Sequence, residues 1–162
     1  MIRIGILSDT HGTIPKQVYS FFEECDEIWH AGDIGPNVLD KLREFKPVVA
    51  VFGNCDGWEY RYKIPETQLF VREGKKIIMT HIGGRPGNYP HNLLPLFESE
   101  KPDIFVCGHS HILRIMYDNV HNFLHINPGA AGRQGIHKDS TLVRFTLDGE
   151  PKDMQICKFD KF

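Results

Sequence analysis

The sequence predicts an α/β (α+β) protein in which two β-sheets pack face to face and helices cover their outer sides. Its first third alternates short apolar strands with helical patterns in the order β-α-β-α-β, which favours parallel strands joined by right-handed crossovers. From Ile104 onward, strand patterns separated by turn residues dominate. The chain has 162 residues, 41% of them hydrophobic, and no repeat or linker divides it. We therefore expect residues 1–162 to form a single domain with a full core.

Three strands and two helices are expected in the first third. Each strand is a short apolar run: Ile2–Leu7, Asp26–Ala31 and Val48–Phe52. Between them, apolar residues recur at helical spacing in residues 14–25 and again in residues 38–45. Pro15 lies near the start of the first helix, where its missing N–H costs little, and Asn37 is a candidate N-cap of the second.

The middle of the chain predicts a hairpin and one further helix. Gln68–Arg72 and Lys76–Thr80 resemble strands and flank the turn sequence Glu73-Gly74-Lys75. Asn92–Glu100 carries its apolar residues at helical spacing and is closed by Pro102. The segment Trp58–Lys63, rich in aromatic and charged residues, has no clear period, and we expect it to be a loop.

The last third predicts strands joined by turns. After the strand that begins at Ile104, the expected strands are Leu113–Tyr117, Phe123–Ile126, Thr141–Leu147 and Met154–Phe159. Asn127-Pro128-Gly129 is typical of a loop, and Asp148-Gly149 of a hairpin turn. A parallel half followed by an antiparallel half is the pattern from which we predict two sheets.

Composition and charge exclude several classes of protein. The formal net charge of −2 gives the chain no general attraction for nucleic acid or for an anionic membrane surface, so a small-molecule substrate is expected. The apolar runs are too short to span a bilayer, and no signal peptide is evident. The four cysteines are scattered and form no CxxC pair, so we expect a cytoplasmic location.

Polar side chains able to bind metal follow five of the predicted strands. They lie just beyond the apolar residues of each strand: Asp9 and His11, Asp33, Asn54, His81, and His109 and His111. The carboxyl ends of parallel strands meet along one edge of a sheet, where ligands bind, so we expect these seven side chains to converge. Each could instead belong to a turn, and Asp9 could cap the first helix. Five such coincidences at strand ends favour a shared site.

This donor set suits two cations better than one. Seven oxygen and nitrogen ligands are too many for a single tetrahedral zinc, whereas two ions can share a bridging carboxylate. Because the set contains no thiolate, it favours Mn²⁺, with Zn²⁺, Fe or Ni²⁺ as alternatives. Two such ions about 3.5–4 Å apart can bind a phosphoryl group and activate a water between them. The sequence therefore predicts two divalent metal ions per chain.

The same residues carry a resemblance to a known family. Five motifs of this chain together resemble the signature of the calcineurin-like metallophosphoesterases: Asp9-x-His11, Gly32-Asp33, Gly53-Asn54-x-Asp56, His81 and Gly108-His109-x-His111. The match covers Ile2 to about Gly132 and is similar, more narrowly, to the small YfcE-type phosphodiesterases of bacteria and archaea. This resemblance implies a four-layer α-β-β-α sandwich of two mixed β-sheets flanked by helices.

The resemblance also implies a role for each donor in metal-dependent hydrolysis of phosphodiester bonds by an activated water. The first ion would be held by Asp9, His11 and His111. The second ion would be held by Asn54, His81 and His109. Asp33 would bridge the two ions. The residues with implied catalytic roles are Asp33, Asn54 and His109.

Cys55 departs from the pattern of many superfamily members, which have a His there to protonate the leaving group or stabilise the transition state. A thiol, with an ordinary pKa of about 8.5, is a poor proton donor and carries no positive charge. Losing such a group typically costs about 10²–10⁴-fold with basic leaving groups. The YfcE-type branch is similar in lacking that His. The implied enzyme prefers activated diesters, such as nitrophenyl diesters, and Asp56, which would orient the missing imidazole, is left with a turn role.

Three residues are candidates for contact with the substrate. Asn54 and Cys55 lie at a strand end, and Arg85, in a Gly-rich loop, could pair with a phosphate through its forked guanidinium. A solvated surface role for Arg85 is equally open. The aromatic residues Trp58, Tyr60 and Tyr62 could line the substrate mouth or support a homo-oligomer.

The remaining histidines have weaker claims to a role in the site. His30 alternates with apolar residues near a strand end and is better explained as a satisfied core histidine. No spacing connects the others to the site: His91, His121, His125 and His137.

A non-catalytic protein-binding scaffold is the main alternative function. The small subunit of the retromer coat has the implied fold, retains part of the signature, serves mainly as a docking surface and also lacks the His at the position of Cys55. The presence of all seven donors in this chain favours the enzyme. A nuclease is a third alternative, against which the net acidity and the absence of a basic stretch argue.

Overall fold

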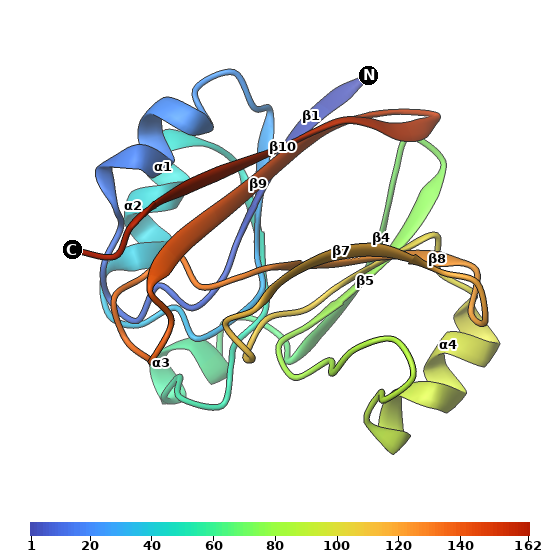
Figure 1. The fold of residues 1–162 in the computed structure, drawn as a ribbon. Coiled ribbons are helices and arrows are strands. Elements are labelled where there is room, and N and C mark those ends of the chain that lie inside the picture. The colour runs from blue at the N-terminus through green and yellow to red at the C-terminus, as the bar shows by residue number, and fades with distance from the viewer.

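The computed structural model describes residues 1–162 and has four layers, with two β-sheets between two layers of helices (Figure 1). The first sheet contains, from edge to edge, β10 (Glu150–Asp160), β9 (Asp139–Asp148), β1 (Ile2–Leu7), β2 (Glu27–His30) and β3 (Val48–Ala50). The second contains β4 (Thr67–Arg72), β5 (Lys75–Thr80), β6 (Ile104–Val106), β8 (Phe123–Pro128) and β7 (Leu113–Asp118). The helices α1 (Lys16–Phe21) and α2 (Val38–Phe45) cover the first sheet, and α4 (Leu94–Glu100) covers the second. The four-layer sandwich of two mixed sheets is confirmed.

Three apolar clusters fill the spaces between these layers, because the central strands are apolar on both faces. In β1, Ile6 points into the cluster between the sheets, whereas the next residue, Leu7, packs with α1 and α2. In β6, Val106 lies between the sheets and Phe105 packs under α4. Burial on both faces explains why these strands are continuous apolar runs in the sequence.

Two connections predicted from the sequence are confirmed. The strands β1, β2 and β3 are parallel neighbours, with α1 and α2 between them along the chain. The strands β4 and β5 form the expected hairpin, with Arg72 opposite Lys75. The turn consists of Glu73 and Gly74, both with positive φ (50° and 75°), which matches the twist that two-residue hairpins favour.

The expectation of a parallel half followed by an antiparallel half is wrong. In the second sheet, β5, β6 and β8 are parallel, whereas the C-terminal hairpin of β9 and β10 returns to the first sheet and pairs antiparallel with β1. The physical reason lies in β1, which is buried on both faces and has β2 on one side only, so a further strand is needed to cover its open edge. Both sheets are mixed as a result.

Some element boundaries also differ from the expectation. Within the segment expected to be a loop, Trp58–Arg61 form one helical turn, α3, in which only Tyr60 is buried, so the sequence has no apolar period there. The helix expected over residues 14–25 is limited to α1, and a 3₁₀ turn, η1 (His91–Leu93), precedes α4. Strand β8 extends to Pro128, where a loop was expected. None of the helices has the length and apolar character needed to cross a membrane.

Candidate metal centre

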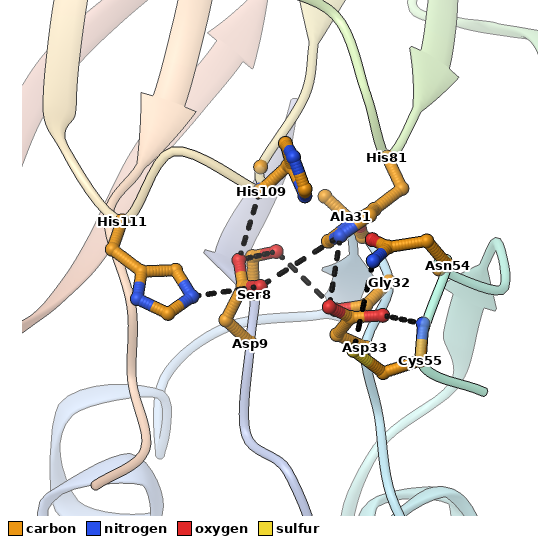
Figure 2. Close-up of polar contacts among 12 residues, drawn as sticks. Ser8, Asp9, Ala31, Gly32, Asp33, Asn54, Cys55, His81, His109 and His111 are labelled. Atoms are coloured by element: carbon orange, nitrogen blue, oxygen red, sulfur yellow. Dashed lines mark hydrogen bonds and ion pairs between the residues drawn. The ribbon is translucent and has the colours of Figure 1, made fainter. Parts of the chain in front are cut away.

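Five strands from both sheets end at one rim of the molecule, and the seven predicted donor residues follow these strands. In the first sheet, β1 is followed by Asp9 and His11, β2 by Asp33 and β3 by Asn54. In the second sheet, β5 is followed by His81 and β6 by His109 and His111. Figure 2 shows side chains from both sets turned toward the same space. The convergence that the sequence predicts at one sheet edge is therefore shared between two sheets.

The donor atoms form two groups of three that share a border. In one group, Asp9, His11 and His111 place their donor atoms within 4.8 Å of one another. In the other, Asp33, His81 and His109 do the same. The Nε2 atom of His11 lies 3.7 Å from Asp9 Oδ1 and 3.7 Å from Asp33 Oδ2, so the two groups are adjacent. This arrangement offers two neighbouring cation positions with Asp33 between them.

The ring of His81 provides a test of whether a cation fits. Its Nδ1 lies 2.7 Å from the carbonyl oxygen of Ala31, which can only accept, so Nδ1 carries a proton. Its Nε2 then faces Asp33 Oδ2 at 3.1 Å and Asp9 Oδ1 at 3.8 Å. Both His81 Nε2 and Asp9 Oδ1 are buried without a hydrogen-bond partner. A buried lone pair beside two carboxylates is costly unless a proton or a metal ion lies between them, so the residues present fit a divalent cation.

Each of the two buried carboxylates has one oxygen anchored and one oxygen free. Asp9 Oδ2 accepts hydrogen bonds from Ser8 Oγ (2.7 Å) and from the backbone N–H of His109 (3.1 Å). Asp33 Oδ1 accepts a hydrogen bond from the backbone N–H of Cys55 (2.8 Å). The anchored oxygens fix the orientation of both carboxylates, and the free oxygens face the imidazole rings (Figure 2).

Charge shifts the pKa values of these groups in opposite directions. Burial alone would raise the pKa of Asp9, but the nearby imidazoles of His11 and His111 lower it overall. Burial would also raise the pKa of Asp33, but the neighbouring imidazole of His81 lowers it overall. Asp9 raises the pKa of His11, and Asp33 raises that of His81 against the effect of burial. Without a metal ion, protons on the imidazoles therefore compensate the carboxylates.

Five of the donor residues have a left-handed backbone. The positive φ angles are 55° at Asp9, 45° at His11, 53° at Asp33, 70° at His109 and 64° at His111, half of the ten non-glycine residues with such angles. A side chain in this conformation costs about 1–3 kcal/mol, so the surrounding structure must enforce it. Strain of this kind is concentrated at functional sites, which favours a site over an ordinary set of turns.

The glycines that precede Asn54 and His109 are required by close contacts. A Cβ atom on Gly53 would lie 2.2 Å from Asp33 Oδ1, and one on Gly108 would lie 2.1 Å from Ser8 Oγ. Any larger residue would displace the carboxylates or their anchors. The Gly-Asn and Gly-His pairs are therefore more than turn dipeptides, and Asp9 does not cap a helix, because α1 begins only at Lys16.

Several supporting residues were not recognised from the sequence. Asp56 does more than shape a turn: its carboxylate accepts hydrogen bonds from the backbone N–H groups of Ile34, Gly35 and Gly53. Asp56 thereby ties the loop that carries Asp33 to the loop that carries Asn54. The only signal in the sequence was its place in the Gly-Asn-x-Asp motif.

Two other polar residues hold the loops from behind. His30 is a satisfied core histidine, as expected: Nδ1 accepts from the N–H of Gly32 (3.1 Å), and Nε2 pairs with Thr10 Oγ1 (3.0 Å). Asn127 Nδ2 donates to the carbonyl oxygen of Gly108 and to Ser110 Oγ, both at 3.0 Å. Asn127 therefore supports the loop that carries His109 and His111.

The candidates for substrate contact are placed differently. Asn54 is exposed beside His81 and Asp33 in Figure 2, and its Nδ2 lies 3.6 Å from Cys55 Sγ. The Cys55 thiol forms a third donor group with His11 and Asp33, and partial burial, followed by the charge of Asp33, raises its pKa. Arg85 is exposed, its side chain makes no hydrogen bond or ion pair, and it does not join either donor group.

A cleft of about 400 Å³ opens beside Asn54 and His81. Its lining is mainly polar and includes Arg61, Glu66 and Asn92. Arg61 is held in place by hydrogen bonds to the carbonyl oxygens of Asp56 (2.7 Å) and Asn54 (3.3 Å). The cleft can therefore accommodate a polar organic group next to the donor atoms.

Comparison with known sequences finds a family match over most of the chain. Residues 2–150 match the calcineurin-like phosphoesterase superfamily domain. A probable metallophosphoesterase of Methanothermobacter thermautotrophicus is 31% identical over 163 residues, which cover 96% of this chain and 91% of the relative. A phosphodiesterase of Methanocaldococcus jannaschii is 28% identical over 149 residues, which cover 79% of this chain and 83% of the relative.

Comparison with solved structures finds the same fold in proteins with little sequence identity. An archaeal phosphodiesterase has a TM-score of 0.77 at 20% identity, with 98% of this chain and 100% of that one covered. Vps29 from Chaetomium thermophilum has a TM-score of 0.75 at 14% identity, with both chains covered completely. These likenesses show the fold.

The raised pKa values predict how the ion-free protein responds to pH. In excess chelator, thermal unfolding followed by circular dichroism should show that His11 and His81 raise the midpoint more at about pH 6 than at about pH 9. A folded-state pKa of His11 and His81 above the unfolded value gives stability that is present in mild acid and is lost as pH rises through the raised pKa. The lowered pKa values of Asp9 and Asp33 act only in stronger acid. Burial lowers the pKa of His30 and His125 to about 4, so these rings destabilise the folded state in mild acid, and the contribution of His11 and His81 is measured against matched variants.

The control for this prediction is a matched pair of histidine variants. Relative to the wild type, His11→Asn should lower the midpoint more at about pH 6 than at about pH 9, whereas His91→Asn, which changes an exposed ring on η1, should leave it unchanged at both. An effect of His11→Asn that is equal at the two pH values would contradict the assignment.

Proposed function

Because this chain belongs to the calcineurin-like phosphoesterase superfamily, we propose that it hydrolyses phosphodiester bonds at a centre of two divalent metal ions. The observation that carries the proposal is the pair of buried, unpartnered atoms His81 Nε2 and Asp9 Oδ1, which face each other across 3.8 Å. The curated relative from Methanocaldococcus jannaschii, a phosphodiesterase, supports the choice of reaction.

In this proposal the two donor groups hold one ion each. The first ion binds Asp9, His11 and His111, and the second binds Asn54, His81 and His109, with Asp33 between them. Asn54 contributes its amide oxygen, which is free because Nδ2 is directed at Cys55. When bound, the two ions supply positive charge to the phosphoryl oxygens and make water acidic enough to act as a nucleophile. Donors of this kind suit Mn²⁺, with Zn²⁺, Fe and Ni²⁺ as alternatives.

The protein's own groups orient the substrate. The exposed amide of Asn54 and the exposed ring of His109 lie on the open side of the rim, where a phosphoryl group would approach. The polar cleft beside Asn54 then receives one organic arm of the diester, with Arg61 and Glu66 available to bind it. Arg85 stays in the proposal as a contact to phosphate through its unpaired, exposed guanidinium.

The leaving group receives little help from Cys55. Its thiol has a raised pKa, so it holds its proton and is a weak acid toward a departing alkoxide. No histidine occupies this position, and Asp56 is engaged with backbone N–H groups. The proposed enzyme therefore prefers diesters whose leaving groups are weak bases over monoesters whose leaving groups are strong bases.

The alternative function is a non-catalytic protein-binding scaffold. Vps29 has the same fold. In this chain, Trp58 at the start of α3 and Tyr62 just after it are 69% and 83% exposed, with ring centroids 5.3 Å apart. A cytoplasmic location is proposed from the four free cysteines. A small-molecule diester is proposed as the substrate, and a homo-oligomer stays a prediction.

Replacement of Asp33 tests the metal centre. Purified wild-type protein loaded with Mn²⁺ should contain two ions per chain by elemental analysis. Asp33→Ala should lose metal, and its turnover of a nitrophenyl phosphodiester should fall by at least about 10²-fold, because both ions lose a ligand. Asp148→Ala, at the exposed end of β9, is the control and should behave like the wild type. Near-normal turnover by Asp33→Ala would refute the assignment, and fewer than one ion per wild-type chain would support the scaffold.

Replacement of Cys55 tests the leaving-group preference. Cys55→His should raise hydrolysis of alkyl phosphomonoesters by about 10-fold or more relative to diesters, because an imidazole can protonate a basic leaving group. Cys55→Ser, which introduces no comparable acid, is the matched control. Steady-state kinetics with one monoester and one diester provide the ratio. An unchanged ratio in Cys55→His would show that proton donation does not limit this enzyme.

A further inference from the structure

His137 lies in the loop between β8 and β9, which several contacts hold against the rim. Its Nε2 and Ser140 Oγ both lie 3.0 Å from the carbonyl oxygen of Gly132. Lys161 Nζ donates to the carbonyl oxygen of Gly135, and the N–H of Thr141 donates to Ala130. The N–H groups of Ala131 and Gly132 donate to the carbonyl oxygens of Ser8 and Asp9, so the loop is attached to the rim through the segment that follows β1.

The contact with Gly132 determines which nitrogen of His137 carries the proton. A carbonyl oxygen only accepts, so Nε2 is the donor and, in the neutral ring, Nδ1 has a free lone pair. This Nδ1 atom is buried and has no hydrogen-bond partner. A buried acceptor without a partner is costly, so its presence beside the rim needs an explanation.

The neighbour of this lone pair is the ring of His111. The two rings are 5.1 Å apart between centroids and meet edge to face at 85°. A Cβ atom on Gly135 would lie 2.4 Å from His111 Nδ1 and 3.1 Å from His137 Nδ1, so both nitrogens border one small space. Gly135 has a φ of 117°, which other residues rarely adopt, and its missing side chain keeps that space open.

The other ring nitrogen of His111 is directed at Asp9. Figure 2 shows His111 Nε2 facing the carboxylate, at 3.3 Å from Oδ1. A histidine that binds a metal through one nitrogen keeps a proton on the other and needs an acceptor for it. In His81 the carbonyl oxygen of Ala31 is that acceptor. His111 Nδ1 has no such partner among the protein's hydrogen bonds.

We infer that His137 positions His111 by accepting a hydrogen bond from His111 Nδ1, directly or through one water, when the cation held by Asp9, His11 and His111 is bound. The inference rests on the proposed function, because it assumes that His111 Nε2 binds a metal ion. His137 then has the same task for the first ion position that Ala31 has for the second. It is a positioning residue, since it acts on the ion only through His111.

Two substitutions separate this role from a structural one. His137→Asn retains a carbonyl oxygen near the place of Nδ1 but loses the contact with Gly132. His137→Gln retains an N–H group near the place of Nε2 but loses the acceptor. A residue that only holds the loop through Gly132 would tolerate Gln and not Asn, and the proposed role gives the reverse.

The measurement is calorimetric titration of the ion-free protein with Mn²⁺. The wild type should bind two ions. In His137→Ala and in His137→Gln, one of the two ions should bind about 10–100-fold more weakly than in the wild type. In His137→Asn, both affinities should stay within about threefold of the wild type. His91→Gln, on η1, is the control and should match the wild type. Wild-type binding in all His137 variants, or retention in Gln with loss in Asn, would overturn the inference while leaving the metal centre intact.

A second measurement reads the protons directly. In the Zn²⁺-loaded protein, ¹⁵N spectra of the imidazoles should show a proton on Nδ1 of His111 and on Nε2 of His137, with His137 Nδ1 shifted as an acceptor. A proton on Nδ1 of His137 would overturn the inference. A wild-type protein that binds no ion in either experiment would overturn the proposed function and this inference with it.

Discussion

The burial of two carboxylates in one small space is the constraint on which the rim depends. Asp9 and Asp33 are 0% and 3% exposed, and both lie within 4 Å of His11 Nε2 and His81 Nε2. Buried anions are strongly destabilising unless positive charge compensates them. Compensation can come from imidazolium protons or from metal ions. The left-handed turns and the close glycines serve this requirement, because they bring imidazoles from distant parts of the chain around the two charges.

The same contacts join the two sheets. Asp9, which follows β1 in the first sheet, accepts a hydrogen bond from the backbone N–H of His109, which follows β6 in the second. His81, which follows β5 in the second sheet, donates to the carbonyl oxygen of Ala31, which follows β2 in the first. Below the rim the sheets are held together mainly by apolar side chains, a contact that has little directional preference. A few polar contacts at the sheet edges, such as Arg72 with Glu27 and Gln68 with the carbonyl oxygen of Ala50, add to it. A cation bound at the proposed centre would have ligands from both sheets, so its binding would stabilise their packing as well as the site. In this proposal, metal affinity and folding are linked.

The convergence of the seven side chains could be predicted because each follows the end of a strand, so a local pattern reports its place in space. The supporting residues leave no such pattern. Asp56 accepts N–H groups from Ile34, 22 residues away, and the neighbour of His137 is the ring of His111, on another loop. The partner of β9 was also not predictable, because it depends on which edge of β1 stays open after β2 has paired. Distances between segments far apart in sequence decide all three cases.

The contacts of Asp56 separate the proposed metal binding from proton donation to the leaving group. The family resemblance gives this carboxylate the task of orienting an imidazole, and Cys55 leaves no imidazole to orient. The carboxylate is nevertheless fully used, because it binds backbone N–H groups of the two loops that carry Asp33 and Asn54. Since backbone contacts rather than the side chain at position 55 hold these loops, that side chain can change without displacing the donors. In the proposed enzyme, leaving-group preference and metal affinity could therefore vary independently.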